Sequence, residues 1–168
     1  MSVLCKWLFA ALAALLATPA TAAVTVSFYS HELGSSFPHA FFTIKGTLDR
    51  GGPPVDSNFG FTAQNVSPAI LMGPVKGVVE SVKPKYVESS DRRFSLTVDD
   101  AKYDALMAVV AKWKAIPGKS YDLGSRNCTH FVGEAARALG LAAPFEKALM
   151  KKPRSFLINV QKLNPWLK

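Results

Sequence analysis

The chain of 168 residues is poor in cysteine and contains only Cys5 and Cys128. Cys5 lies in a stretch with the features of a cleaved leader, so Cys128 would have no partner within the mature chain. This excludes a framework of intramolecular disulfide bonds and leaves one unpaired thiol in an oxidising compartment. Such a thiol is either buried and inert or used for chemistry.

The chain also lacks an apolar run of membrane-spanning length. The longest run, residues 7–17, is roughly eleven residues, whereas a spanning helix needs about 20. A lysine precedes this run, and small residues follow it at 20–23. This order predicts a secretory signal peptide over residues 1–23, with cleavage after Ala22 or Ala23. We therefore expect a periplasmic or secreted protein without a permanent membrane span, and a retained anchor is the alternative.

Repeats and low-complexity segments are absent from the remainder, residues 24–168, which predicts a single domain with a basic C-terminal tail. The formal net charge is +8, and much of the excess lies late in the chain. A basic surface outside the cytoplasm favours anionic envelope polymers or lipid head groups. Nucleic acid is not expected as a partner, because no nucleic-acid-binding motif accompanies the charge. A solvated tail without a partner is the alternative.

The order of elements predicts an α+β domain. Alternating or continuous apolar runs between proline, glycine and other turn residues predict strands at 24–30, 39–44, 58–62, 77–82 and 93–98. Two helices are predicted from the three- and four-residue spacing of apolar side chains, at 101–116 and 128–139. We expect a loop at 31–38, a loop or turn at 83–91, and a short helix within the tail. The sheet should be mostly antiparallel and packed against the helix that begins at Cys128.

Cys128 is the candidate nucleophile because it lies in the first turn of its predicted helix. The positive end of a helix, with a nearby imidazolium, lowers the pKa of a thiol below the ordinary value of about 8.5. Asn127 is predicted to cap this helix and to leave first-turn N–H groups facing an oxyanion. Tyr121 could place its hydroxyl over the same oxyanion pocket, although a core tyrosine with a solvated tip is the alternative.

A cysteine nucleophile needs a base, and the chain offers three histidines. His39 begins a predicted strand in an otherwise apolar segment, which makes it the first candidate. His31, in the predicted loop, is the second candidate. His130 follows Cys128 by two residues and should point about 200° away from it around the helix. A chain without a catalytic histidine remains the third possibility.

The imidazole also needs a polar group that fixes its orientation. Asn58 on the next predicted strand is the first candidate, with Asp56 and Gln64 behind it. The alternative is that Asn58 merely terminates a turn.

Three segments resemble a known superfamily: Tyr121-Asp122-Leu123, Asn127-Cys128-Thr129-His130-Phe131-Val132 and, far upstream, His39-Ala40-Phe41-Phe42. They are similar to the circularly permuted branch of the NlpC-like, papain-fold cysteine peptidases, whose relatives include the lecithin:retinol acyltransferase-like and PPPDE-type families. The resemblance covers roughly residues 26–140 in order of elements. It implies a papain-like fold with a thiol–imidazole dyad, in which Cys128 attacks a carbonyl and His39 moves the proton.

The resemblance also implies a function. Amide bonds are the usual target of this superfamily, and exported bacterial members often cut the peptide part of peptidoglycan. We therefore expect an exported thiol hydrolase that cleaves amides in cell-wall peptides through an acyl-enzyme. A lipid acyltransferase or thioesterase is one alternative, and it predicts an exposed apolar patch beside Cys128. A catalytically inactive envelope-binding module is the other. No cofactor is expected, because one cysteine and three scattered histidines lack the spacing of metal ligands.

Overall fold

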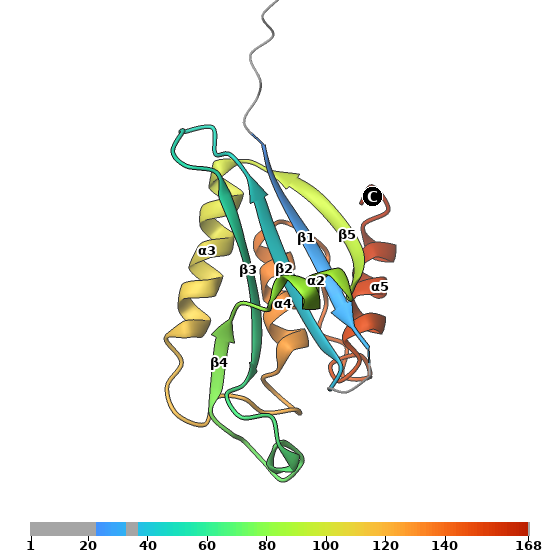
Figure 1. Cartoon of the computed structure of the whole chain (residues 1–168). Coiled ribbons are helices and arrows are strands. Elements are labelled where there is room, and N and C mark those ends of the chain that lie inside the picture. Colours follow the sequence, from blue (N-terminus) through green and yellow to red (C-terminus); the bar gives the residue numbers. More distant parts are fainter. Residues whose placement is uncertain (1–22, 33–36, 168) are drawn as a thin grey trace, which may run out of the picture.

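The computed structural model describes residues 23–32 and 37–167, so the predicted signal peptide lies outside it apart from residue 23. Five antiparallel strands form one sheet in the order β4-β3-β2-β1-β5 (Figure 1). Their bounds are β1 (Val24–His31), β2 (His39–Gly46), β3 (Val55–Ala63), β4 (Gly77–Glu80) and β5 (Asp91–Val98). The predicted α+β class and the antiparallel sheet are confirmed.

Helices cover the two faces of the sheet unequally. Three of them, α3 (Asp100–Lys114), α4 (Cys128–Ala138) and α5 (Pro153–Leu163), pack behind the sheet, and the short α2 (Pro84–Glu88) crosses its front (Figure 1). A single turn of 3-10 helix, η1 (Pro68–Leu71), lies at the lower end of the molecule in this view. Among the residues that the structure describes, no helix has the length and apolar character needed to cross a membrane.

Side-chain alternation along β2 decides which residues face which helices. Phe42 points to the rear and packs on Phe131 of α4, with 5.5 Å between ring centroids. Phe41 points to the front, where its ring lies 5.1 Å from that of Tyr29 and 5.8 Å from that of Tyr86 in α2. His39, two residues before Phe41, shares the front face.

The hydrophobic core lies between the sheet and the three rear helices, and its members come from Val24 to Leu167. The tail contributes to it directly, because α5 buries Phe156, Leu157 and Val160 and contacts β1 and β5. The helix predicted in the tail is therefore confirmed, and it is part of the core. The core of the described part of the chain is thus built from both the sheet and the tail.

Two expectations about loops are wrong. His31 is the last residue of β1 and pairs directly with His39, so it lies in the sheet and not in a loop. Residues 84–88 form α2 where a loop or turn was expected. Pro84 occupies the first turn of this helix, where proline removes no helical hydrogen bond and its fixed φ suits the helix.

Candidate active site

Cys128 lies at the N-terminus of α4, at the point where two strands separate. The pairing of β2 with β3 ends at Phe41 and Gly60, whereas the pairing of β2 with β1 continues to His39. Just past the end of the β2–β3 pairing, the backbone amide of Ala40 lies close enough to Sγ of Cys128 to lower the pKa of the thiol. Ala40 follows His39 in the chain, so the thiol lies near the strand that carries the predicted dyad partner. The cysteine is 4% exposed.

The imidazole of His39 lies over the backbone of Gly60. A Cβ atom at Gly60 would lie 2.5 Å from Nε2 and 3.3 Å from Cε1 of His39, which is too close for Nε2. Glycine at this position therefore leaves the space that the ring fills. Tyr86 of α2 approaches the ring edge-on, with 6.5 Å between centroids.

His39 is neutral at physiological pH. Burial lowers its pKa from 6.5 to about 4, and the charge of His31 directly opposite acts in the same direction. A neutral imidazole can accept a proton, which is what a general base requires.

Burial has the opposite effect on the thiol. It raises the pKa of Cys128, and this outweighs the amides of Ala40, Thr129 and Cys128 itself, which lower it. The hydroxyl of Thr129 acts in the same direction as the amides, although it is buried and forms no well-shaped hydrogen bond with any described residue. The expectation of a lowered thiol pKa is therefore wrong for the resting site. The helix end and the amides favour a thiolate, but removal of water disfavours it more.

The resting pair is thus a neutral thiol and a neutral imidazole. Among the described residues no hydrogen bond joins Sγ of Cys128 to the ring of His39: the sulfur approaches the end of β2 from the side of α4, and the ring lies on the front face. Proton transfer between them requires the thiol or the ring to turn into the opening beyond the last β2–β3 pair.

Tyr121 lies near both groups, since it lines a cavity with His39 and interacts electrostatically with Cys128. Its backbone forms a two-way bridge with Val75, with both N–H to O distances 2.9 Å, and its ring packs 5.5 Å from that of Phe61. Burial raises the pKa of the Tyr121 hydroxyl, and the negative charge of a Cys128 thiolate raises it further. The hydroxyl therefore stays protonated and lies within electrostatic reach of the sulfur, as a donor to an oxyanion must.

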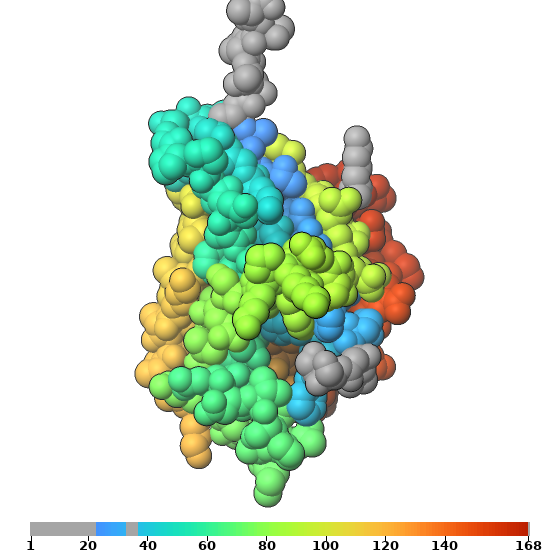
Figure 2. All heavy atoms as spheres, in the orientation of Figure 1, coloured from blue at the N-terminus to red at the C-terminus, as the bar shows by residue number. Residues whose placement is uncertain are grey.

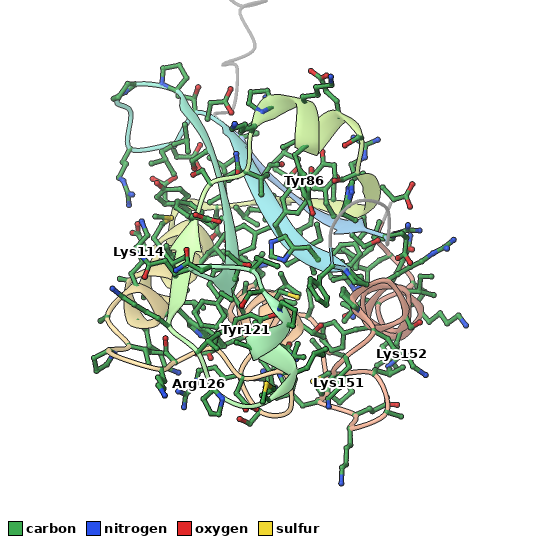
Figure 3. The ribbon with its side chains drawn as sticks, turned by 60° about the horizontal axis from the view of Figure 1, so that its bottom comes forward. Tyr86, Lys114, Tyr121, Arg126, Lys151 and Lys152 are labelled. Carbon is green, nitrogen blue, oxygen red and sulfur yellow. The ribbon has the colours of Figure 1, made fainter. Side chains whose placement is uncertain are left out.

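A cavity of about 700 Å³ opens beside this group. Tyr121, His39 and Tyr86 line it, whereas Cys128 does not. Figure 3 shows this end of the molecule, with Tyr121 near the middle and Tyr86 above it. Six of the remaining lining residues are apolar: Phe37, Pro38, Ala63, Val66, Ile70 and Val82. The other four are polar or charged: Thr62, Glu80, Ser81 and Lys83.

Asn127 caps α4 as predicted. Its Oδ1 accepts from the amides of Thr129 and His130, and its Nδ2 donates to the carbonyls of Leu123 at 2.9 Å and Met150 at 2.8 Å. These bonds use the whole side chain and two of the amides of the first turn. The Asn127 side chain is therefore no oxyanion donor, and the amide of Cys128 is the one that the cap leaves unused.

The structure does not bring Asn58 to His39. Oδ1 of Asn58 accepts from the amide of Val82 at 2.7 Å, and its Nδ2 donates to the carbonyl of the same residue at 3.2 Å. Asn58 thus ties β3 to the segment after β4. Asn58 is therefore not the group that orients the His39 ring.

The other two histidines are engaged elsewhere. Nδ1 of His31 lies 3.0 Å from Oγ of Ser90, and the ring stacks on Tyr86 with centroids 4.3 Å apart. Nδ1 of His130 accepts from the backbone amide of Asn127 at 3.4 Å in a capping box. His39 therefore stays the first candidate for the base. Within residues 23–32 and 37–167, no group of three or more His, Cys, Asp or Glu side chains could hold a metal ion.

The sequence matches no protein-family model, no curated protein and no solved structure. The interpretation of this site therefore depends on its own residues. The likeness to the NlpC-like superfamily stays a proposal that its short motifs support.

Three contributors to the site were missed by the sequence analysis. Gly60 gives His39 its space, the Ala40 amide lowers the pKa of the thiol, and Tyr86 lines the cavity. Proline at the start of residues 84–88 was the available signal for the helix that carries Tyr86. Nothing local marks the roles of Gly60 and Ala40, because both depend on contacts between separate elements.

The lowered pKa of His39 predicts acid-sensitive stability. Between pH 6.5 and about 4, the unfolded chain binds a proton at His39 that the folded chain does not, so stability falls as the pH drops through this range. We expect His39 to account for a loss of about 2 kcal/mol in the free energy of unfolding between pH 7 and about pH 4.5. Urea unfolding at the two pH values measures the loss, and His39→Gln should remove this share of it. An equal pH dependence in both proteins would contradict the assigned pKa.

Proposed function

We propose that this protein is a cysteine hydrolase in which Cys128 forms an acyl-enzyme and His39 transfers the proton. One observation carries the proposal. Around the end of β2 lie the thiol of Cys128 beside the Ala40 amide, the neutral ring of His39 on the other face of the strand, and the protonated hydroxyl of Tyr121. A nucleophile, a base and an oxyanion donor are the three parts that acyl transfer needs.

In the first half of the reaction, the thiol proton of Cys128 passes to His39 while Sγ forms a bond to the substrate carbonyl carbon. The hydroxyl of Tyr121 and the amide of Cys128 donate hydrogen bonds to the resulting oxyanion. The carbon–nitrogen bond then breaks, and the departing amine takes the proton from His39. This leaves the acyl group on sulfur as a thioester.

In the second half, water attacks the thioester. His39 accepts a proton from the water, the carbon–sulfur bond breaks, and the proton returns to Sγ, so the enzyme is restored. The ring of His39 is deprotonated at neutral pH and can accept a proton, but its lowered pKa makes it a weaker base than a free histidine.

The substrate that we propose is an amide bond in a cell-envelope peptide. The signal-peptide pattern at the start of the chain supports export, and the net charge of +8 supports a location among anionic polymers. The strand-borne histidine that precedes a helix-borne cysteine supports membership of the permuted NlpC-like, papain-fold superfamily, in which such peptides are frequent substrates.

A lipid acyltransferase or thioesterase is the second candidate, and the cavity favours it. Its lining is mainly apolar, and Phe37 and Val66 at its border are 42% and 56% exposed. A cavity of this kind can accept an acyl chain.

Mass spectrometry of the acyl-enzyme tests the proposal. The chain from residue 23 onward is incubated with muropeptides or with phospholipid vesicles, quenched in acid and digested with trypsin. Cleavage after Arg126 and Arg137 releases residues 127–137, which contain Cys128. We expect an added acyl mass on this fragment that hydroxylamine removes, and a new amine among the muropeptide products.

The same experiment separates the alternatives. An acyl mass that arises from phospholipid and not from muropeptide supports the second candidate and overturns the first. An unmodified 127–137 fragment together with unchanged substrates overturns both, and favours a binding module with an inert thiol.

A further inference from the structure

Large apolar side chains are exposed around η1, next to the mouth of the cavity. Leu71 and Met72 are 68% and 90% exposed, whereas the preceding Ile70 is buried and lines the cavity. Val66 and Phe37, also exposed, border the same cavity. In Figures 1 and 2 the η1 segment is the lowest projection of the molecule, beyond the end of the sheet. We define the apolar tip as these four exposed side chains, Phe37 and Val66 at the cavity and Leu71 and Met72 at the end of η1.

Proline holds this tip in shape. Pro68 occupies the first turn of η1, and Pro74 follows Met72 by two residues. Their fixed φ angles reduce the conformations open to the segment. The chain then returns to the body at Val75, which is bridged to Tyr121. A projecting apolar segment with few accessible conformations suits insertion into an apolar phase.

Basic side chains surround the apolar tip. Lys76 and Lys119 line the shallow hollow that also contains Met72. Arg126 and Lys151 lie near Asp122 on the same end of the molecule, and Figure 3 shows them on either side of η1, with Lys152 further out. All five are exposed, and none of them forms an ion pair with another described residue.

We propose that this end of the molecule docks on the surface of an anionic phospholipid bilayer, with Leu71 and Met72 inserted among the acyl chains and the basic side chains on the head groups. An apolar tip ringed by lysine and arginine is the arrangement that binds such an interface, since apolar burial and charge attraction act together. Docking in this orientation turns the cavity mouth toward the lipid surface. The inference concerns location and does not depend on which acyl bond Cys128 cleaves.

Vesicle co-sedimentation tests the docking. The chain from residue 23 onward is mixed with vesicles of phosphatidylcholine alone or of phosphatidylcholine and phosphatidylglycerol in a 3:1 ratio. We expect binding to the anionic vesicles that falls about tenfold or more on neutral vesicles or at high salt. Leu71→Ser/Met72→Ser should lower binding to anionic vesicles by about tenfold or more.

A matched variant controls for the loss of exposed apolar surface. Leu163 ends α5 and Trp166 follows it, with exposed fractions of 46% and 60%, and Leu163→Ser/Trp166→Ser should bind as the unmodified chain does. Equal loss in both double variants, equal binding to neutral vesicles, or no binding would overturn the proposal. So would a dimer in sedimentation velocity without lipid that Leu71→Ser/Met72→Ser converts to a monomer, because the apolar tip would then be a dimer interface.

Cys128→Ala separates this inference from the proposed function. This variant should bind vesicles unchanged while it forms no acyl-enzyme. A chain that acylates Cys128 but ignores vesicles would overturn the docking alone, and one that binds vesicles without acylation would overturn the catalytic proposal alone.

Discussion

Cys128→Ser is expected to lower the turnover of the proposed substrate by about 10⁴-fold or more, because the variant loses the nucleophile. His39→Gln is expected to lower it by about 10²- to 10⁴-fold, since the thiol then has no base. Glutamine keeps much of the size and polarity of histidine, so it still fills the space above Gly60. The measurement is the initial rate of amine release at saturating substrate, with the folded fraction checked by circular dichroism.

The double variant shows whether the two residues act as a unit. If Cys128 and His39 form a dyad, the second substitution should add little, because removal of either partner already disables the same step. Full multiplication of the two losses would mean independent roles and would contradict the dyad.

Substitutions at the other histidines serve as controls. His130→Gln keeps a capping box, because glutamine is a favoured residue at that position of the helix. His31→Gln removes the charge opposite His39 and should raise the pKa of His39 without removing the base. Both variants should retain most of the rate at neutral pH. A loss at His31 as large as that at His39 would transfer the role of base to His31.

The elements that sequence analysis predicted well are those with local signals. The apolar alternation of β1, the apolar run of β2 and the cap at Asn127 each lie within a few consecutive residues, and the structure places all three as expected. The loops were predicted poorly for the same reason. The end of β1 at His31 is fixed by its pairing with β2, and that pairing leaves no mark in the sequence around His31.

In the candidate site, too, only the features with local sequence signals could be predicted. Position in the chain was enough to select Cys128, Asn127 and His39 as candidates. It could not give the pKa of the thiol, because that depends on burial by side chains from other elements, which exceeds the effect of the helix end. Position in the chain also suggested Asn58 as the group that orients His39, because a residue on the neighbouring predicted strand can reach that ring. The carbonyl and amide of Val82 occupy Asn58 instead, and only the folded chain reveals them.

Asn127→Ala is expected to destabilise the fold by about 3 kcal/mol and to abolish most of the activity. Loss of the helix cap costs about 1 kcal/mol, and the buried carbonyl of Met150 and the partly buried carbonyl of Leu123 lose their donors at about 1 kcal/mol or more each. The first turn of α4 then loses its anchor to the segments before and after it, so Sγ of Cys128 leaves its place at the Ala40 amide. Urea unfolding gives the stability, and the rate at a temperature where the variant is folded gives the activity.

Asn164→Ala separates the two effects. Asn164 is also buried, and its side chain bonds both backbone groups of Ala142 and the carbonyl of Val160 at the C-terminal end of α5. Its loss should destabilise the fold by a similar amount, because it too breaks several buried hydrogen bonds. It should leave the rate per folded molecule unchanged, since it touches neither α4 nor the cavity. If Asn127→Ala likewise kept its rate per folded molecule, the position of the sulfur would not depend on the cap, and the N-terminus of α4 would have no part in catalysis.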